Sequence, residues 1–210
     1  MLGASIRKAA MLEPMLVFLM IMQYIWALRY SHPAMWLLIL GLILLSHRVR
    51  RERAQALGFE VGGLRNCWEE YAPALVFLVL ALVASGILMQ TTRPISFDRA
   101  LLSWMAYMPW GLFQQYVLNG YFLNRFDAVF SRRAAPLVAA ALFSGAHLPN
   151  GFLMAVTLIL GYLSTHIYRK YNNLYFLGLA HGTVGFCLFL VVPDSISHHL
   201  TVGPGWFSHP

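Results

Sequence analysis

Three short polar clusters interrupt the apolar stretches in the second half of the chain, at residues 113–119, 143–150 and 181–185. A neutral imidazole accepts a proton near neutral pH, so His147 and His181 are candidate catalytic bases. The same two rings are candidate ligands for a divalent metal such as zinc. An amide is effectively non-basic, but it can orient a water molecule or a substrate. These residue types predict a site whose titratable members are the two histidines.

Spacing in the first cluster assigns its amides to helix faces. Gln115 and Asn119 are four residues apart and share one face of a helix, whereas Gln114 lies about 100° around the axis. These three amides are candidates to orient water or substrate.

The other two clusters contain the histidines. Phe143 and His147 are also four residues apart, and a proline two residues after His147 predicts a helix end near Asn150. In the third cluster, Thr183 and the glycines beside it would allow another helix or a ligand to approach His181 closely. Phe143, Asn150 and Thr183 are therefore candidate supporting or substrate-binding residues.

The elements that carry these clusters must be membrane helices. The 210 residues are 59% hydrophobic and only 11% charged, whereas about 25% of residues are charged in an ordinary soluble domain. A hydrocarbon layer of about 30 Å needs roughly 20 apolar residues per helix, so the length allows about seven spans. We therefore expect an all-α, polytopic helix bundle that forms one membrane domain over residues 1–210. The expected spans are Pro14–Tyr30, Ala34–Leu45, Tyr71–Gln90, Ala100–Asn124, Ala134–Leu148, Gly151–Tyr168 and Leu174–Pro193.

The distribution of positive charge predicts the orientation. With the amino terminus in the cytoplasm, 12 of the 15 Lys and Arg residues fall in cytoplasmic segments and three in external ones. Seven spans then place the carboxy terminus outside, with residues 194–210 as an external tail. The net charge of +7 thus reads as a topology signal and not as a nucleic-acid surface. We expect an integral protein of a bacterial-type plasma (inner) membrane, with lipid and membrane-associated peptides or proteins as partners.

The depth of the clusters brings most of them to one layer. Gln115 and Asn119 lie roughly 8 to 14 Å from the inner end of their span, and His181 about 10 to 12 Å from the inner end of its own. His147 joins them if its short helix is tilted. Polar residues in membrane helices either serve function or hydrogen-bond to a neighbouring helix. Convergence of three clusters on one layer favours the functional reading.

In this order and on these helices, the clusters resemble the CPBP family of intramembrane proteases, which includes the Ras-converting CAAX prenyl proteases. The family pattern is EExxxR, then FxxxH, then HxxxN. Phe143 and His147 fit the second motif, and His181 opens the third. The resemblance covers roughly residues 100–191 and includes a run similar to the family's stretch before the last histidine: Gly161-Tyr162-Leu163, Tyr168-Arg169-Lys170 and Asn173-Leu174.

The first motif departs from the family. Gln114 and Gln115 stand where the family has glutamates, Asn119 replaces the arginine and Gly185 replaces the final asparagine. In the family, the first glutamate and the histidines are thought to activate water for attack on the peptide bond. Loss of a general base typically lowers the rate by about 10²- to 10⁴-fold. His147 or His181 would then have to take over as the base.

No other acid offers an obvious replacement. Glu69 and Glu70 form an interfacial pair, and the remaining acids fall at predicted helix ends or in loops: Glu13, Glu52, Glu60, Asp98, Asp127 and Asp194. The tail histidines His198, His199 and His209 form only a weak metal-binding pattern, so we expect a solvated tail. Cys67 and Cys187 have no metal-type spacing and predict no disulfide framework.

Two functions follow. The resemblance implies a CAAX-protease-like intramembrane endopeptidase with an atypical, glutamine-substituted site, acting on membrane-associated peptides that include lipidated ones. The alternative is a catalytically inactive relative, a pseudoenzyme, that binds a hydrophobic peptide, a lipid or a membrane partner. A small transporter or structural subunit ranks last, because the polar clusters are confined to the later helices.

Overall fold

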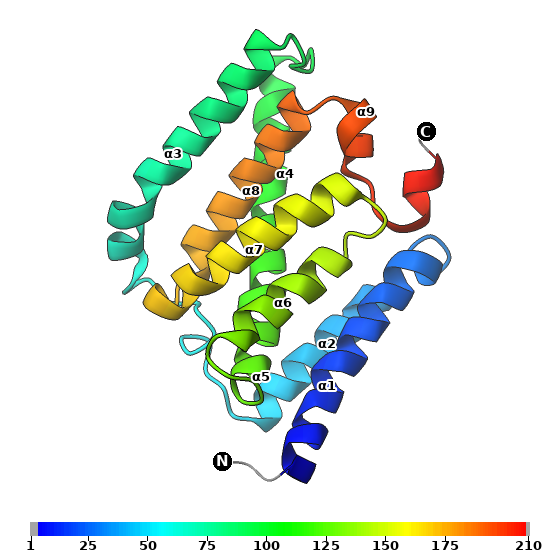
Figure 1. The fold of residues 1–210 in the computed structure, drawn as a ribbon, viewed down its shortest axis with the longest axis vertical. Helices are drawn as coiled ribbons and strands as arrows, with labels where there is room; N and C mark the ends of the chain where they lie inside the picture. The colour runs from blue at the N-terminus through cyan, green and yellow to red at the C-terminus, as the bar shows by residue number, and fades with distance from the viewer. Residues whose placement is uncertain (1–3, 209–210) are drawn as a thin grey trace.

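A computed structural model describes the backbone of residues 4–208 and the side chains of residues 10–208. Every regular element in this part of the chain is helical (Figure 1). The elements are α1 (Ala4–Gln23), η1 (Tyr24–Leu28), α2 (Met35–Val49), α3 (Leu64–Leu88), α4 (Phe97–Gln115), η2 (Tyr116–Leu123), α5 (Asn124–Asp127), α6 (Ala134–Gly145), α7 (Gly151–Tyr171), α8 (Leu174–Val191), α9 (Asp194–Ser197), η3 (His198–Leu200) and η4 (Gly203–Ser208). The all-α prediction is confirmed.

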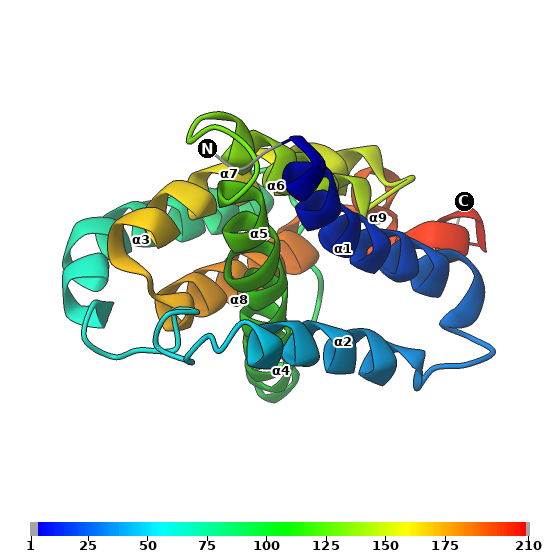
Figure 2. The same ribbon diagram turned by 90° about the horizontal axis from the view of Figure 1, so that it is seen from below.

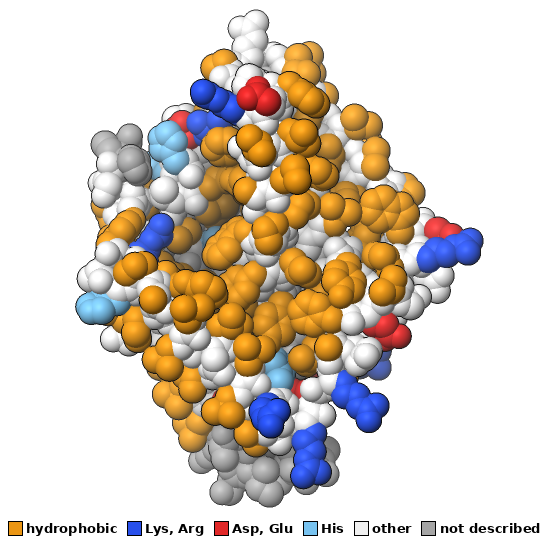
Figure 3. Space-filling view, turned by 180° about the vertical axis from the view of Figure 1, so that it is seen from behind, with side chains coloured by type: hydrophobic (Ala, Val, Ile, Leu, Met, Phe, Trp, Pro, Cys, Tyr) orange, Lys and Arg blue, Asp and Glu red, His pale blue; other side chains and the backbone are white. Residues whose placement is uncertain are grey.

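Several of these helices suit a membrane. Among the described residues, four are long and apolar enough to cross one, namely Ala10–Leu28, Leu64–Leu88, Gly151–Tyr171 and Leu174–Val191. Two further apolar helices, α2 and α6, are shorter. Figure 3 shows apolar side chains over the middle of one face and charged side chains around its margins. The protein is an integral membrane protein, and the count of seven spans and the orientation of the termini stay predictions.

A single continuous helix forms the centre of the bundle. It begins as α4, widens into the π-helix η2 and ends as α5 (Figures 1 and 2). Helix α8 packs along α4, while α6 packs against α7 and α3 against α8. Helices α1 and α2 lie together on the other side of α4 and α5 from α3 (Figure 1). The third predicted cluster is thereby pressed against the first.

Glycines make the contact between α4 and α8 close. A Cβ atom on Gly182 would lie 2.7 Å from the carbonyl oxygen of Tyr107, and one on Gly111 would lie 2.6 Å from the carbonyl oxygen of Gly178. Such distances leave no room for a side chain. Gly182, which was predicted to admit a helix or a ligand beside His181, admits helix α4.

At one end of the bundle, which we call the basic end, a buried arginine holds several elements together. Both terminal nitrogens of the Arg125 guanidinium donate to the Glu52 carboxylate at 2.8 Å, and its Nε contacts Glu13 at 3.4 Å. The Nδ1 atom of His47 lies 2.5 Å from Glu52, and Ser46 accepts from Arg125 at 3.0 Å. We call Glu13, Ser46, His47, Glu52 and Arg125 the Arg125 cluster.

The structure corrects the expectation for one acid of the Arg125 cluster. Glu13 lies inside α1, which begins at Ala4 and not near Pro14, whereas Glu52 lies in the loop after α2, in agreement with the prediction. Partial burial raises the pKa of the Glu52 carboxyl, but hydrogen bonds from Arg125 and His47 outweigh it and hold that pKa below its ordinary value. Both carboxylates therefore act as partners of a buried charge.

At the opposite end, which we call the tail end, residues 194–208 form a packed segment that we call the C-terminal strap. Ser197 and Gly203 are buried, and the side-chain nitrogen of Asn150 donates to the carbonyl oxygens of Ser197 at 2.8 Å and Thr201 at 3.1 Å. The solvated-tail prediction was wrong for the buried part of this segment, because Asn150 satisfies the backbone carbonyls of Ser197 and Thr201, whereas Ile196 and Phe207 are exposed. His209 lies outside the described residues.

Candidate active site

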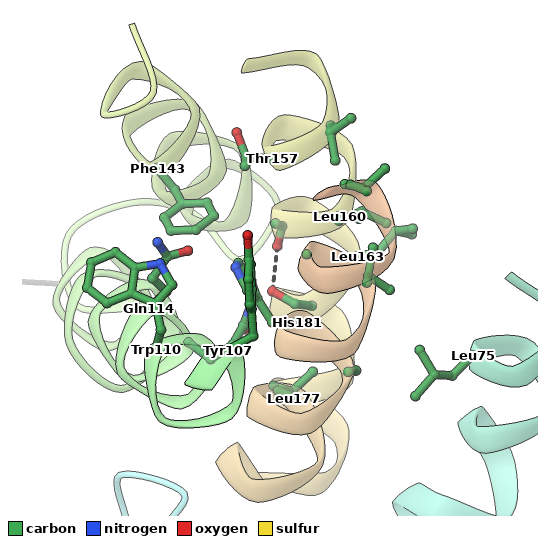
Figure 4. A pocket seen from close by; sticks show the side chains of 18 of the residues that line it. Leu75, Tyr107, Trp110, Gln114, Phe143, Thr157, Leu160, Leu163, Leu177 and His181 are labelled. Atoms are coloured by element: carbon green, nitrogen blue, oxygen red, sulfur yellow. Dashed lines mark hydrogen bonds between the residues drawn. The ribbon is translucent and has the colours of Figure 1, made fainter. Parts of the chain in front are cut away.

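A cavity of about 840 Å³ lies among α3, α4, α6, α7, α8 and the C-terminal strap (Figure 4). Along α8 it extends from Phe176 to Leu188, a helical rise of about 18 Å. Its walls are mainly apolar, and no charged Asp, Glu, Lys or Arg side chain of the described residues lines it. Gln114, Gln115 and the two motif histidines, His147 and His181, all line this one cavity. We call these four residues the site cluster.

A chain of hydrogen bonds sets the protonation of the His181 ring. Ser164 donates its hydroxyl proton to the carbonyl oxygen of Gly161 at 2.8 Å, so its oxygen is free to accept from Asn119 at 3.3 Å. The same Asn119 nitrogen donates to Gln115 Oε1 at 2.7 Å.

The orientation of the Gln115 amide determines which nitrogen of the His181 ring carries the proton. Since its oxygen accepts from Asn119, its nitrogen faces His181 Nδ1 at 3.0 Å and donates to it. An imidazole that accepts at Nδ1 carries its proton on Nε2 when neutral. His181 therefore offers an N–H donor at Nε2.

His147 has the opposite arrangement. Its Nδ1 lies 2.8 Å from the carbonyl oxygen of Phe143, and a carbonyl oxygen can only accept, so Nδ1 carries the proton. The neutral ring then keeps its lone pair on Nε2. The Phe143 ring packs against both imidazoles, with centroid separations of 5.1 Å to His147 and 6.0 Å to His181. The cavity thus holds one ring that can accept a proton and one that can donate a hydrogen bond.

Gln114 adds a polar group beside this pair. Figure 4 shows Gln114 and Phe143 near His181. The side-chain oxygen of Gln114 is buried and has no hydrogen-bond partner within the described part of the chain. A buried unpaired acceptor is costly unless a water or a ligand completes it. The site therefore has room for a further hydrogen-bond donor at Gln114.

The other predicted residues lie behind this first layer. Asn119 is fully buried below Gln115, and Phe143 lines the cavity. Asn150 caps α7, since its side-chain oxygen accepts from the amide of Leu153 at 3.1 Å. Thr183 accepts from the Trp104 indole at 3.2 Å. Asn150 and Thr183 are not among the residues that line the cavity, so their contacts are with the protein.

Sequence reasoning missed three features of the site. The π-helix η2 begins directly after Gln115, and π segments in α-helices are frequent at functional sites; the sequence carries no simple pattern for it. Ser164 completes the chain of hydrogen bonds behind His181, and a polar residue on an apolar span was the signal that could have found it. His166 also lines the cavity, near the basic end of α7.

The donor set does not fit a resident zinc ion. Catalytic zinc sites generally use three protein ligands, and no group of three or more His, Cys, Asp or Glu side chains in the described residues could hold a metal. Three imidazoles line the cavity, those of His147, His166 and His181, but they do not form such a group, and the other polar groups of the lining are amides and hydroxyls.

The comparisons with known proteins agree with the motifs. Residues 96–187 match the family model described as Type II CAAX prenyl endopeptidase Rce1-like, which confirms the resemblance to the CAAX protease family over this part of the chain. The match includes all four residues of the site cluster. No curated protein and no solved structure matches the chain.

Proposed function

We propose that this protein is an intramembrane endopeptidase in which His147 is the general base. The observation that supports this most strongly is the opposite hydrogen bonding of the Nδ1 atoms of His147 and His181, which accounts for their opposite protonation. A hydrolase needs a group that takes a proton from water and a donor that stabilises the developing oxyanion. His147 Nε2 supplies the first and His181 Nε2–H the second, without a carboxylate.

The proposed reaction balances with these groups. His147 Nε2 takes a proton from water as the water oxygen attacks the peptide carbonyl carbon, and the carbonyl electron pair moves onto its oxygen. That oxyanion accepts a hydrogen bond from His181 Nε2. The intermediate then collapses, the C–N bond breaks, and the proton passes from His147 to the leaving amine. Gln114 orients the water, while Asn119 and Gln115 hold the His181 ring.

The walls of the cavity suit a hydrophobic substrate. The apolar lining favours burial of a peptide with apolar side chains or an attached lipid. With the basic end in the cytoplasm, as the charge distribution predicts, such a peptide enters from the cytoplasmic side of a bacterial-type plasma membrane. The proposed substrates are therefore membrane-associated peptides, including lipidated ones.

The test is cleavage of membrane-tethered peptides by the purified, reconstituted protein. We expect His147→Ala to lower the rate by about 10²- to 10⁴-fold, because it removes the general base. His181→Ala should lower it by about 10²- to 10³-fold, as the loss of an oxyanion donor does. His32→Ala, which changes an exposed histidine on a turn, should cleave at the parent rate.

Glutamine substitutions separate the two roles. An amide can donate a hydrogen bond but cannot accept the proton of water. His181→Gln should therefore keep more activity than His181→Ala, whereas His147→Gln should be as impaired as His147→Ala. Equal turnover by the parent, His147→Ala and His181→Ala would exclude the proposal.

One observation favours a second candidate, a pseudoenzyme that binds a hydrophobic peptide, lipid or membrane partner. The cavity lining contains no carboxylate among the described residues, in contrast to the paired glutamates of the family motif. The triple variant Gln114→Glu, Gln115→Glu, Asn119→Arg rebuilds that motif. Cleavage by the triple variant but not by the parent would support the pseudoenzyme, whereas cleavage by the parent would exclude it.

A further inference from the structure

The C-terminal strap is fastened to the rest of the protein at three places. At its start, the Asp194 carboxylate receives two hydrogen bonds from the Arg93 guanidinium, one of them 2.8 Å long. In the middle, it is held by Asn150, which is fully buried at the start of α7. Near its end, the amide of Gly203 donates to the carbonyl oxygen of Leu148 at 2.8 Å. The strap is a fixed part of the fold.

The third attachment requires glycine at position 203. The backbone φ angle there is +63°, and a Cβ atom would lie 2.9 Å from the Ile25 side chain. The strap is thus pressed against η1 as well as against the turn between α6 and α7. Figure 1 shows the end of the strap beside the end of α1.

Between these attachments the strap contributes two side chains to the cavity, those of Leu200 and Val202. Three consecutive residues, His198, His199 and Leu200, have φ angles of 46°, 53° and 54°, a conformation that residues other than glycine adopt only uncommonly. Such a backbone persists where the surrounding contacts determine it. The attachments therefore fix the direction in which Leu200 enters the cavity.

This wall is next to the proposed base. Leu148, which accepts the hydrogen bond from Gly203, directly follows His147. A substrate held for attack by a water on His147 would thus meet Leu200 and Val202 on the tail-end side.

We propose that the C-terminal strap is a fixed wall closing the tail end of the substrate cavity, and that Leu200 limits the size of the substrate group beside His147. The proposal that the strap closes the cavity does not depend on the catalytic mechanism. The role of Leu200 in specificity rests on the proposed endopeptidase function.

A labelling experiment tests the wall without any substrate. In a Cys67→Ala, Cys187→Ala background, Leu153→Cys places the only thiol on the cavity lining at the start of α7. A charged, membrane-impermeant maleimide is applied to each face of sealed vesicles. Asp194→Asn weakens the first attachment, and Asp98→Asn is the control, because Asp98 is an exposed aspartate close to Arg93 in the sequence.

We expect labelling from the tail-end face to be about tenfold faster in Asp194→Asn than in the parent, as for the loss of a charge-assisted hydrogen bond. Asp98→Asn should label at the parent rate. Equal labelling rates in Asp194→Asn and the parent, with the same unfolding temperature, would contradict the proposal that the strap closes the tail end of the cavity.

A cleavage experiment tests Leu200. For peptides with a large or a small residue next to the scissile bond, Leu200→Ala should raise the large-over-small ratio of kcat/KM by about tenfold, as removal of a few methylene groups permits. Leu200→Trp should lower this ratio. Ile196→Ala, an exposed strap residue, is the control. An unchanged ratio in both Leu200 variants would refute the specificity role, whereas absence of cleavage by the parent would count against the endopeptidase itself.

Discussion

The site cluster and the Arg125 cluster lie near the two ends of the same π-helix, η2, yet they differ in charge and in contacts. Gln115 directly precedes η2, and Arg125 follows it in α5. In the Arg125 cluster, a guanidinium that is 4% exposed meets two carboxylates. In the site cluster, neutral amides and imidazoles meet a cavity and keep unused hydrogen-bonding atoms.

This difference distinguishes a cluster with a structural role from a cluster that can take part in a reaction. A charge in a low-dielectric interior must be paired, so a buried arginine with partners for its nitrogens has little capacity left for a ligand. A neutral imidazole held by one ring nitrogen leaves the other free to react. Pairing of the Arg125 guanidinium with carboxylates therefore marks the Arg125 cluster as a structural joint between α1, α2 and α5, although His47 Nε2 has no hydrogen-bond partner within the described part of the chain. The site is marked by unused hydrogen-bonding atoms that line a cavity.

The largest expected effect is on the Arg125 cluster. Arg125→Met leaves the Glu13 and Glu52 carboxylates without their shared partner and should lower the free energy of unfolding by about 3 kcal/mol. The value lies at the low end for a buried pair because both carboxylates are partly exposed. Thermal unfolding in detergent measures the change.

The matched control is Arg65→Met, whose guanidinium is 86% exposed and contacts Glu69 four residues away. Its effect should be about 0.5 kcal/mol or less. Equal destabilisation by the two variants would mean that burial does not distinguish the Arg125 cluster.

Substitution of Asn119, which holds Gln115 in place, should have a smaller effect on stability and a clear effect on activity. Asn119→Leu removes the donor to Gln115, at a cost of about 1 kcal/mol. The Gln115 amide can then rotate and accept from His181, which moves the imidazole proton to Nδ1 and removes the Nε2 donor. We expect kcat to fall about tenfold or more, since an oxyanion donor is lost in part.

Thr165→Val serves as the control, because Thr165 is a buried polar residue on α7 that bonds only locally. It should cost similar stability and leave kcat unchanged. If both variants lowered kcat to the same extent, Asn119 would have no role in positioning His181.

The smallest expected effect is the response to acid. The pKa of Glu52 lies below its ordinary value of 4.5, so its stabilisation is fully present above pH 4.5 and is lost as the pH falls through the folded-state pKa. The unfolding temperature should be flat in this respect from pH 8 to 5 and should fall by a few degrees below pH 4.5. Glu52→Gln should remove this part of the fall, and an unaltered acid profile in that variant would contradict it.

The sequence predicted the residues of the candidate site more fully than the contacts that position them. The spacing of Gln115 and Asn119 and of Phe143 and His147 anticipated shared helix faces, because helical geometry is local. The contact between Gln115 and His181 spans 66 residues and depends on how closely α4 approaches α8. The glycines beside Thr183 predicted a close approach, but they did not indicate which helix would make it.

The sequence did not predict the pairing of the acids or the packing of the tail. Glu13 and Glu52 were expected at helix ends or in loops, and nothing in their neighbourhood in the sequence points to Arg125. The tail looked solvated, since its many polar and glycine residues suit water as well as they suit Asn150. In both cases the partner is far away in the chain.

By itself, the sequence determined that this is an all-α membrane protein, that its polar clusters share one region and that its first motif lacks carboxylates. These properties follow from composition, periodicity and residue type. Only the tertiary structure decided which nitrogen of each histidine is free, which charges are paired and that Leu200 and Val202 of the C-terminal strap line the cavity. Protonation, ion pairing and the lining of the cavity depend on atoms brought together from distant parts of the chain, and no local pattern encodes those distances.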